Sequence, residues 1–389
     1  MSSDRFSFLE FEDDAPAEAA PLEAGPLSRG IGIERLPDGT ALAEVRLNAP
    51  RETGDDEDDG VMTLSARAGR ANTPAAAAPT HLRVVEVFGG RGAGADQFHY
   101  PTGLAVDRSG ILFVADTYNH RIQRITPSGG VAAIGGRGTA RAQFLSPQGV
   151  AVDAEDSFYV VEQGGSRVQK FTREGVLTLV FGRAGRAEGE LNGPTGIAVA
   201  LTGDIYICDT GNSRVQRFDA EGRFLGVIGA PGLYGAGLSS PQAVAVDPGG
   251  NLYAADTGQS RLVRFDPVGR ADRQIGGVSG NGRRTRDDSL PLPLHSPRAM
   301  VIDPMGLLYV ADGGEPDPLT GEMRGRVRCL LLSNGEVLAT VDRVGRSLGT
   351  LLRPGGLALT PIAAADGLQR GDLYIADTLN HRVLRFSWG

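Results

Sequence analysis

Six copies of one short phrase set the strongest limit on how this chain can fold. Each copy begins with proline, continues with a variable residue and ends in a short apolar run: PTGLAVD (101–107), PQGVAVD (147–153), PTGIAVA (194–200), PQAVAVD (241–247), PRAMVID (297–303) and PGGLALT (354–360). Successive prolines are 46, 47, 47, 56 and 57 residues apart. Such a fixed period is typical of repeat architectures, in which each repeat is one supersecondary unit.

Each repeat is predicted to consist of four strands, a to d. A second phrase follows each first one, as in VADTYNHR, VVEQGGSR, ICDTGNSR, AADTGQSR, VADGG and IADTLNHR. Short apolar runs alternate with turns that contain Gly or Asn, which is typical of a propeller blade. The 56 Gly and 23 Pro agree with many tight turns. No long stretch has the 3.6-residue periodicity of a helix.

The spacing also predicts how the ring closes. In five cases thirteen residues separate the last apolar residue of strand d from the next proline, beginning with Phe88 and Pro101. Residues 84–90 are therefore a strand d that precedes any strand a, whereas 382–387 are a strand c without a following strand d. We expect the first strand to complete the last blade, which removes open sheet edges. The predicted fold is an all-β, six-bladed propeller over residues 82–389.

The segments PTGLAVD…ILFVADTYNHRIQRI (101–125) and LYIADTLNHRVLRF (373–386) resemble NHL repeats, which are named after an Asn-His-Leu type of triplet. The triplet positions are Asn119-His120 and Asn380-His381. The resemblance extends over roughly 82–389 and implies a six-bladed β-propeller of the NHL type. Propellers similar to this one include peptidyl-amidoglycolate lyases, whose histidines bind zinc in the central mouth, and sugar-lactone hydrolases, which use carboxylates around a metal.

Neither enzyme site is visible in this sequence. The resemblance places the residue after each strand-a proline near the mouth, and these residues are Thr102, Gln148, Thr195, Gln242, Arg298 and Gly355. None is a histidine or a carboxylate. We therefore predict no catalytic residue, no bound metal and no cofactor, and keep a metal-dependent lyase or hydrolase as the alternative function.

Repeated charged and histidine residues are interpreted as structural. An acidic residue and an arginine recur at every turn between strands b and c: Asp116/Arg121, Glu162/Arg167, Asp209/Arg214, Asp256/Arg261, Asp312/Arg326 and Asp377/Arg382. A feature present in every blade is one that the blade needs, so we predict ion pairs and turn hydrogen bonds. His120 and His381 occupy a position where other repeats have serine, which argues against zinc ligation.

The N-terminal segment 1–81 is predicted to be a disordered acidic tail. Its first 80 residues contain 16 acidic and 7 basic side chains, and a lone hairpin is possible over 33–47. The remainder is close to neutral, which makes nucleic acid an unexpected partner. Basic residues near Arg283 and Arg298, together with Tyr234, leave RNA binding as a further alternative. Cys208 and Cys329 are expected to be packing residues. Without a signal peptide or a membrane-spanning stretch, we expect a cytoplasmic monomer that does not bind membranes.

Blade 5 differs from the repeat twice on one face, which we call the top. The loops 276–296 and 313–325 each contain nine extra residues. Ligand-contacting loops concentrate on rigid scaffolds, and Arg298 is expected to point into the mouth near Gln242. We therefore predict a non-catalytic recognition or scaffold module that binds a protein or a small polar ligand on this face. The predicted binding residues are Arg284, Arg286, Asp288, His295, Arg298, Glu315 and Gln242.

Overall fold

The computed structural model describes residues 33–35, 41–43, 61–63, 81–232, 237–276, 294–314, 325–332, 337–341, 351–361 and 371–388. The chain divides into two compact units, 1–57 and 58–389. In the first unit, β1 (Ile33–Arg35) pairs with β2 (Ala41–Ala43), within the predicted hairpin. Most of the segment predicted to be disordered, 1–81, lies outside the described residues.

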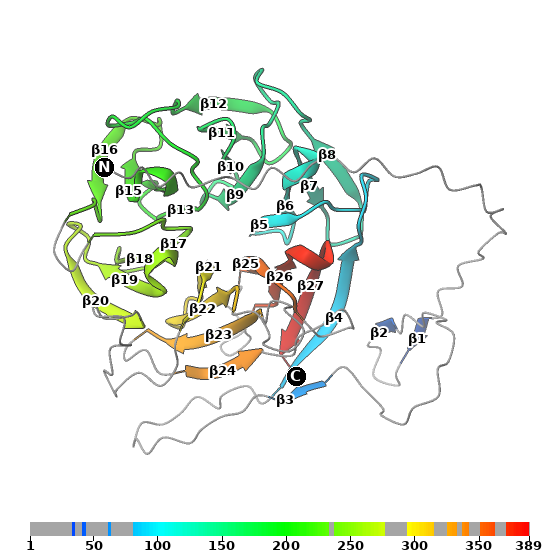
Figure 1. Cartoon of the computed structure of the whole chain (residues 1–389). Coiled ribbons are helices and arrows are strands. Elements are labelled where there is room, and N and C mark those ends of the chain that lie inside the picture. The colour runs from blue at the N-terminus through cyan, green and yellow to red at the C-terminus, as the bar shows by residue number, and fades with distance from the viewer. Residues whose placement is uncertain are drawn as a thin grey trace, which may run out of the picture. The chain divides into compact units, whose positions relative to one another are not determined.

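Six antiparallel sheets form the blades of the second unit, and the prediction of an all-β, six-bladed propeller is confirmed (Figure 1). Each sheet keeps its strands in the order a-b-c-d, with strand a nearest the centre. The first three blades are β5 (Pro101–Val106), β6 (Leu112–Asp116), β7 (Arg121–Ile125) and β8 (Val131–Ile134); β9 (Pro147–Val152), β10 (Phe158–Glu162), β11 (Arg167–Phe171) and β12 (Leu177–Phe181); β13 (Ile197–Val199), β14 (Ile205–Asp209), β15 (Arg214–Phe218) and β16 (Phe224–Ile228).

Blades 4 to 6 follow the same plan, except that the last blade takes its outer strands from the N-terminal side of the propeller. They are β17 (Ala243–Val246), β18 (Leu252–Asp256), β19 (Arg261–Phe265) and β20 (Ala271–Gly276); β21 (Pro297–Ile302), β22 (Leu307–Asp312), β23 (Arg326–Leu331) and β24 (Val337–Val341); β25 (Pro354–Leu359), β26 (Leu373–Asp377) and β27 (Arg382–Trp388), followed by β4 (His81–Gly89) and β3 (Val61–Thr63).

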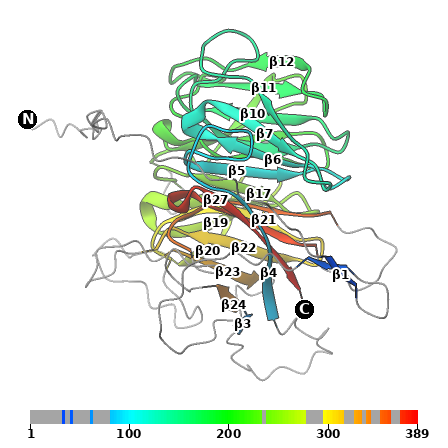
Figure 2. The same cartoon turned by 90° about the vertical axis from the view of Figure 1, so that its right-hand side faces the viewer.

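The two ends of the repeat region lie side by side. β4 pairs antiparallel with β27, with Phe88 opposite Val383 and Val87 opposite Leu384 (Figure 2). The inner strands also form a continuous ring, because β5 contacts both β9 and β25. The strand that the spacing assigned to the last blade is therefore paired in that blade.

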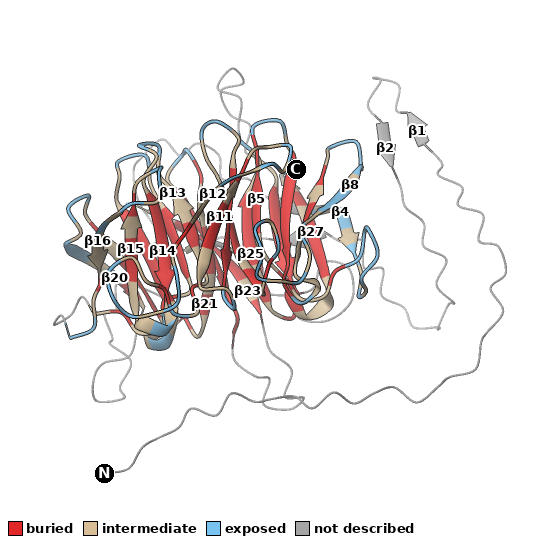
Figure 3. Ribbon diagram, turned by 90° about the horizontal axis from the view of Figure 1, so that it is seen from above, coloured by how far each residue is buried: buried red, intermediate tan, exposed pale blue. Residues whose placement is uncertain are grey.

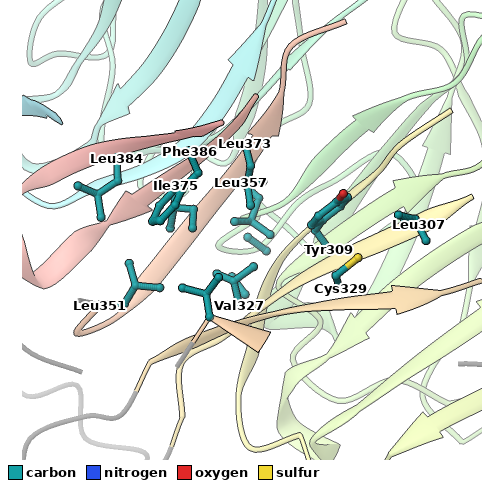
Figure 4. Packing of buried hydrophobic residues seen from close by; sticks show 13 residues of the cluster. Leu307, Tyr309, Val327, Cys329, Leu351, Leu357, Leu373, Ile375, Leu384 and Phe386 are labelled. Carbon is teal, nitrogen blue, oxygen red and sulfur yellow. The ribbon is translucent and has the colours of Figure 1, made fainter. Parts of the chain in front are cut away.

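The core consists of six hydrophobic clusters, one between each pair of neighbouring blades. The cluster between blades 5 and 6 packs Tyr309 and Val327 of one blade against Ile375 and Phe386 of the other (Figure 4). Buried residues fill the inner strands of the blades, while exposed residues lie in the turns and on outer strands such as β4 and β8 (Figure 3). Repeated residues thus pack against the next repeat, which explains why the apolar phrases recur.

Small residues bring the inner strands close together around the centre. A Cβ at Gly103, Gly149 or Gly196 would collide with the carbonyl oxygen of the next blade's strand a. Glycine therefore allows a backbone approach that a larger residue would prevent. The short distance between the inner strands also allows hydrogen bonds between blades. The hydroxyls of Thr102 and Thr195 donate to the carbonyls of Gln148 (2.9 Å) and Gln242 (3.0 Å) in the following blades.

Candidate functional site

The inner strands surround a cavity of about 340 Å³. Sites for small molecules commonly have volumes from about 300 to 1,000 Å³. All six residues that follow the strand-a prolines line it: Thr102, Gln148, Thr195, Gln242, Arg298 and Gly355. The resemblance to NHL propellers therefore placed the mouth positions correctly. The cavity is large enough for one small molecule and too small for a folded partner.

Arg298 extends from β21 into this cavity and reaches the neighbouring blade. Its Nη1 donates to Gln242 Oε1 at 3.0 Å, so the predicted proximity of these two side chains is present. Its Nε is buried and has no hydrogen-bond partner among the described residues. Burial, and next the charge of Arg353, lower the pKa of Arg298 to about 10, whereas Asp312 acts in the opposite direction. Arg298 remains charged at neutral pH but is poorly solvated.

Arg353 is the second cation of the cavity, and sequence reasoning missed it. It precedes Pro354 and lines the mouth beside blade 5. Within the described ranges, the guanidinium groups of Arg298 and Arg353 form no ion pair, in contrast to Arg214, whose Nε lies 2.7 Å from Asp209 Oδ2. As far as the described residues form the lining, it contains no carboxylate. The described lining therefore has an excess of positive charge.

Two tyrosines of blade 1 form an aromatic lip on the cavity. Tyr100 and Tyr118 both line it, and their ring centroids lie 4.7 Å apart. Tyr118 is 51% exposed, so much of its surface is open to a ligand. His99 and His381 pack behind them, with His381 edge-on to Tyr100 at 4.9 Å. The sequence analysis did not single out either tyrosine.

Tyr100 occupies a backbone conformation that rarely suits an aromatic residue. Its φ is +57°, and the residues that precede the prolines of blades 2 to 4 have similar positive values. Those residues are Ser146, Gly193 and Ser240. The positive φ thus belongs to this loop in blades 1 to 4, and blade 1 differs only in that a bulky aromatic residue adopts it, which is uncommon. Comparing the residue before each proline across the repeats would have revealed both Tyr100 and Arg353.

The acidic residues at the b–c turns hold the blades together, in agreement with their structural interpretation. Asp209 is fully buried and accepts bonds from the backbone N–H of Asn192 (2.7 Å) and from the side chains of Arg214 and Gln216. The Arg214 guanidinium in turn donates to the carbonyl of Ala187 in the preceding loop. The equivalent acidic residues of the other blades are also buried, and none of them lines the cavity: Asp116, Glu162, Asp256, Asp312 and Asp377.

His120 and His381 serve as hydrogen-bond acceptors at blade junctions. His120 Nδ1 accepts the backbone N–H of Ser146 at 2.9 Å, and His381 Nδ1 accepts that of Tyr100 at 3.1 Å. In blade 3 the serine at this position, Ser213, accepts the N–H of Ser240. An accepting Nδ1 requires that nitrogen to be unprotonated. Burial lowers the pKa of both histidines, with Arg137 adding to the effect at His120 and His99 at His381.

Only part of the predicted binding set falls on described residues. Arg284, Arg286, Asp288 and Glu315, like Arg283 and Tyr234 of the RNA alternative, lie outside them. Arg298 and Gln242 meet in the cavity. His295 is elsewhere, in the loop before β21, where its backbone N–H lies 3.2 Å from the Asp312 carboxylate and its carbonyl accepts from Ser260.

The residues of the mouth do not fit a metal centre. Metals in lyases and lactone hydrolases need histidine, cysteine or carboxylate ligands. The lining residues that the structure describes include none of these types. Elsewhere in the described ranges, no three such residues are grouped closely enough to hold an ion. Cys208 is buried, and burial strongly raises the pKa of its thiol.

The comparisons with known proteins agree with this fold. The family model for the NHL repeat matches residues 98–125, 191–218 and 238–265. The chain is a six-bladed β-propeller that contains NHL repeats. A search among curated proteins found no match. The short 3-10 turns of this NHL propeller are the helices in its described part, and none has the length or apolar character to cross a bilayer.

Several solved structures share the fold of this NHL propeller at low sequence identity. A streptogramin B lyase is 13% identical, with a TM-score of 0.53 over 79% of this chain and 98% of the lyase. A gluconolactonase from Xanthomonas campestris is 18% identical, with a TM-score of 0.55 over 79% and 89% of the two chains. A Bacteroides thetaiotaomicron protein of unknown function is 15% identical, with a TM-score of 0.56 over 79% and 75%. At these identities the likeness concerns the fold alone.

Proposed function

We propose that this NHL propeller is a non-catalytic recognition module and that its central mouth binds a small polar ligand. The main support for this proposal is the cavity itself, whose lining combines amide and guanidinium groups with two tyrosines. A few polar groups converging on a cavity of this size favour recognition of a small molecule. Among the described residues, the lining offers neither a metal-ligand set nor a nucleophile beside a general base.

A ligand screen with a blocked cavity tests this function. Gln148 is half-buried on the lining, and its side chain lies 3.3 Å from that of Gln163. Gln148→Trp places an indole in the mouth while leaving the repeated turn residues intact. In ligand-observed NMR with neutral and charged polar metabolites, we expect compounds that bind the wild type and not this variant. If every bound compound binds both proteins equally, the mouth is not the ligand site.

The loops of blade 5 provide the finer form of the proposal. We keep the loops 276–296 and 313–325, with Arg284, Arg286, Asp288, His295 and Glu315, as proposed ligand contacts beside Arg298. Trimming both loops to the length found in other blades should leave the propeller folded, as judged by its melting temperature, and weaken ligands found in the screen. Unchanged binding after trimming would remove these loops from the site.

Metal analysis separates recognition from the enzymatic alternative. A metal-dependent lyase or hydrolase purified under mild conditions would contain stoichiometric zinc or calcium. We expect no stoichiometric metal, because neither the mouth nor the described blade junctions provide a suitable ligand set. Zinc that is present in the wild type and lost in His120→Ser or His381→Ser would contradict the recognition function.

A further inference from the structure

Unlike the repeated arginines of the b–c turns, the two arginines of the mouth form no ion pair with a described residue, although the charge of Asp312 opposes the lowering of the Arg298 pKa. Arg121, Arg167 and Arg214 each bind the buried carboxylate of their own blade, at 2.8, 2.6 and 2.7 Å. Among the described residues, Arg298 binds only the neutral amide of Gln242, and no ion pair involves Arg353. The pairing of an arginine with a buried carboxylate, which the blades repeat, is therefore not found among the described residues of the cavity.

Keeping these charges in the cavity costs free energy that an anion would offset. A buried polar group without a hydrogen bond is unfavourable, and Arg298 Nε is such a group. The charge of Arg353 adds repulsion, because it lowers the pKa of Arg298 together with burial. An oxyanion in the cavity that accepts from the Nη groups of Arg298 would reduce the repulsion between the two arginines. Guanidinium groups suit carboxylate and phosphate because their donors are arranged as a planar fork.

This inference rests on the proposed ligand-binding function. We propose that the ligand of the mouth is a small anion whose carboxylate or phosphate oxygens bind between Arg298 and Arg353. Gln242 positions Arg298 for this contact, since its Oε1 accepts from Nη1 at 3.0 Å. A volume of about 340 Å³ limits the ligand to a small molecule.

The tyrosines add a second recognition element, a surface for a flat ring. Tyr118 stands where blades 2 to 4 have Gly164, Gly211 and Gly258, as the shared backbone hydrogen bond to the preceding loop indicates. Tyr100 is held at positive φ where other blades have Ser or Gly. Both departures from the repeat fall in one blade and on one cavity. The body of the anion therefore carries a planar ring that stacks on Tyr118.

Three probes separate the charged contact from the ring contact. Phenyl phosphate carries both elements, inorganic phosphate carries only the charge, and benzyl alcohol carries only the ring. Binding is measured by isothermal titration calorimetry at fixed ionic strength. A parallel titration with benzoate tells whether carboxylate or phosphate is preferred. The variants are Arg298→Gln, Arg353→Gln and Tyr118→Gly, with Arg223→Gln as the control on the exposed surface.

We expect phenyl phosphate to bind most tightly. Arg298→Gln and Arg353→Gln should each weaken both phosphates about tenfold or more, as expected for lost hydrogen bonds to a charged group. Tyr118→Gly should weaken phenyl phosphate at least about fivefold, as expected for lost stacking on an aromatic ring, and leave inorganic phosphate unchanged. Arg223→Gln should bind like the wild type.

Equal binding of phenyl phosphate by the wild type and both mouth arginine variants would overturn the anion site. That result leaves the recognition function intact if neutral ligands are still lost in Gln148→Trp. The recognition function fails separately, when no ligand of any charge depends on the cavity. Arg353 is half-buried and forms no ion pair with a described residue, so its variant keeps the test valid if Arg298→Gln destabilises the fold.

Discussion

The b–c turns and the central mouth use the same residue types for opposite purposes. At the turns, each arginine meets a buried carboxylate, and the arrangement recurs around the ring. In the mouth, Arg298 and Arg353 face a cavity whose described lining has no carboxylate. The difference teaches that repetition marks what the blade needs in order to fold. Departures from the repeat mark positions that folding does not require and that are available for binding a ligand.

The largest expected effect concerns the strand that completes the last blade. Deleting residues 1–92 removes β4, so the edge of β27 loses its partner and is free to pair with another chain. We expect aggregation, or a melting temperature far below that of the wild type. Deleting residues 1–75 keeps β4 and should leave the melting temperature nearly unchanged. Two equally stable, monomeric truncations in size-exclusion chromatography would mean that β4 does not stabilise the ring.

A repeated turn carboxylate should have the next largest effect. Asp209→Ala removes the acceptor of the Asn192 N–H and one of the acceptors of the Arg214 guanidinium and the Gln216 amide. Breaking one partner of a buried pair typically costs about 3–5 kcal/mol, and we expect a loss of that order in urea unfolding. The matched control is Arg223→Ala, whose side chain is 74% exposed. It should cost less than about 1 kcal/mol. Similar costs for both variants would refute a structural role of the turn network.

The junction histidines should have a smaller, pH-dependent effect. Burial lowers the folded pKa of His120 and His381 below 6.5. Their contribution is therefore complete above about pH 6.5 and is lost as the pH falls through the folded pKa. Arg137 lowers the pKa of His120 in the same direction, while Asp116 opposes the shift at His381.

The double variant His120→Ser/His381→Ser should change stability little at pH 7.5, because Ser213 accepts the corresponding N–H in blade 3 and Ser260 occupies the position in blade 4, where it donates to the His295 carbonyl. It should lose less stability than the wild type between pH 7.5 and 5.5. Part of the dependence should persist, because the pKa of His99 is lowered too. Parallel stability curves for the two proteins would show that these histidines do not act as neutral acceptors.

Most of the fold was predictable because the repeat supplies its own alignment. The spacing from Phe88 to Pro101, together with a strand c at 382–387 that has no following strand d, predicted that 84–90 belong to the last blade, where β4 pairs with β27. The mouth was predictable only in part. Arg298 and Gln242 follow a strand-a proline and could be placed by that position, but Tyr118 lies in a turn that no apolar period constrains. Whether Tyr118 lines the mouth depends on which blades surround it, and this arrangement is set only when the ring is closed.

Arg298→Gln tests the central claim most directly, because stability and binding can be measured on one protein. The account predicts that urea unfolding is unchanged or slightly more favourable to the folded state, since a poorly solvated charge is removed. It also predicts that phenyl phosphate binding in calorimetry falls about tenfold or more. A loss of stability as large as that of Asp209→Ala, with binding unchanged, would contradict the account. Arg298 would then be another structural residue of the blade.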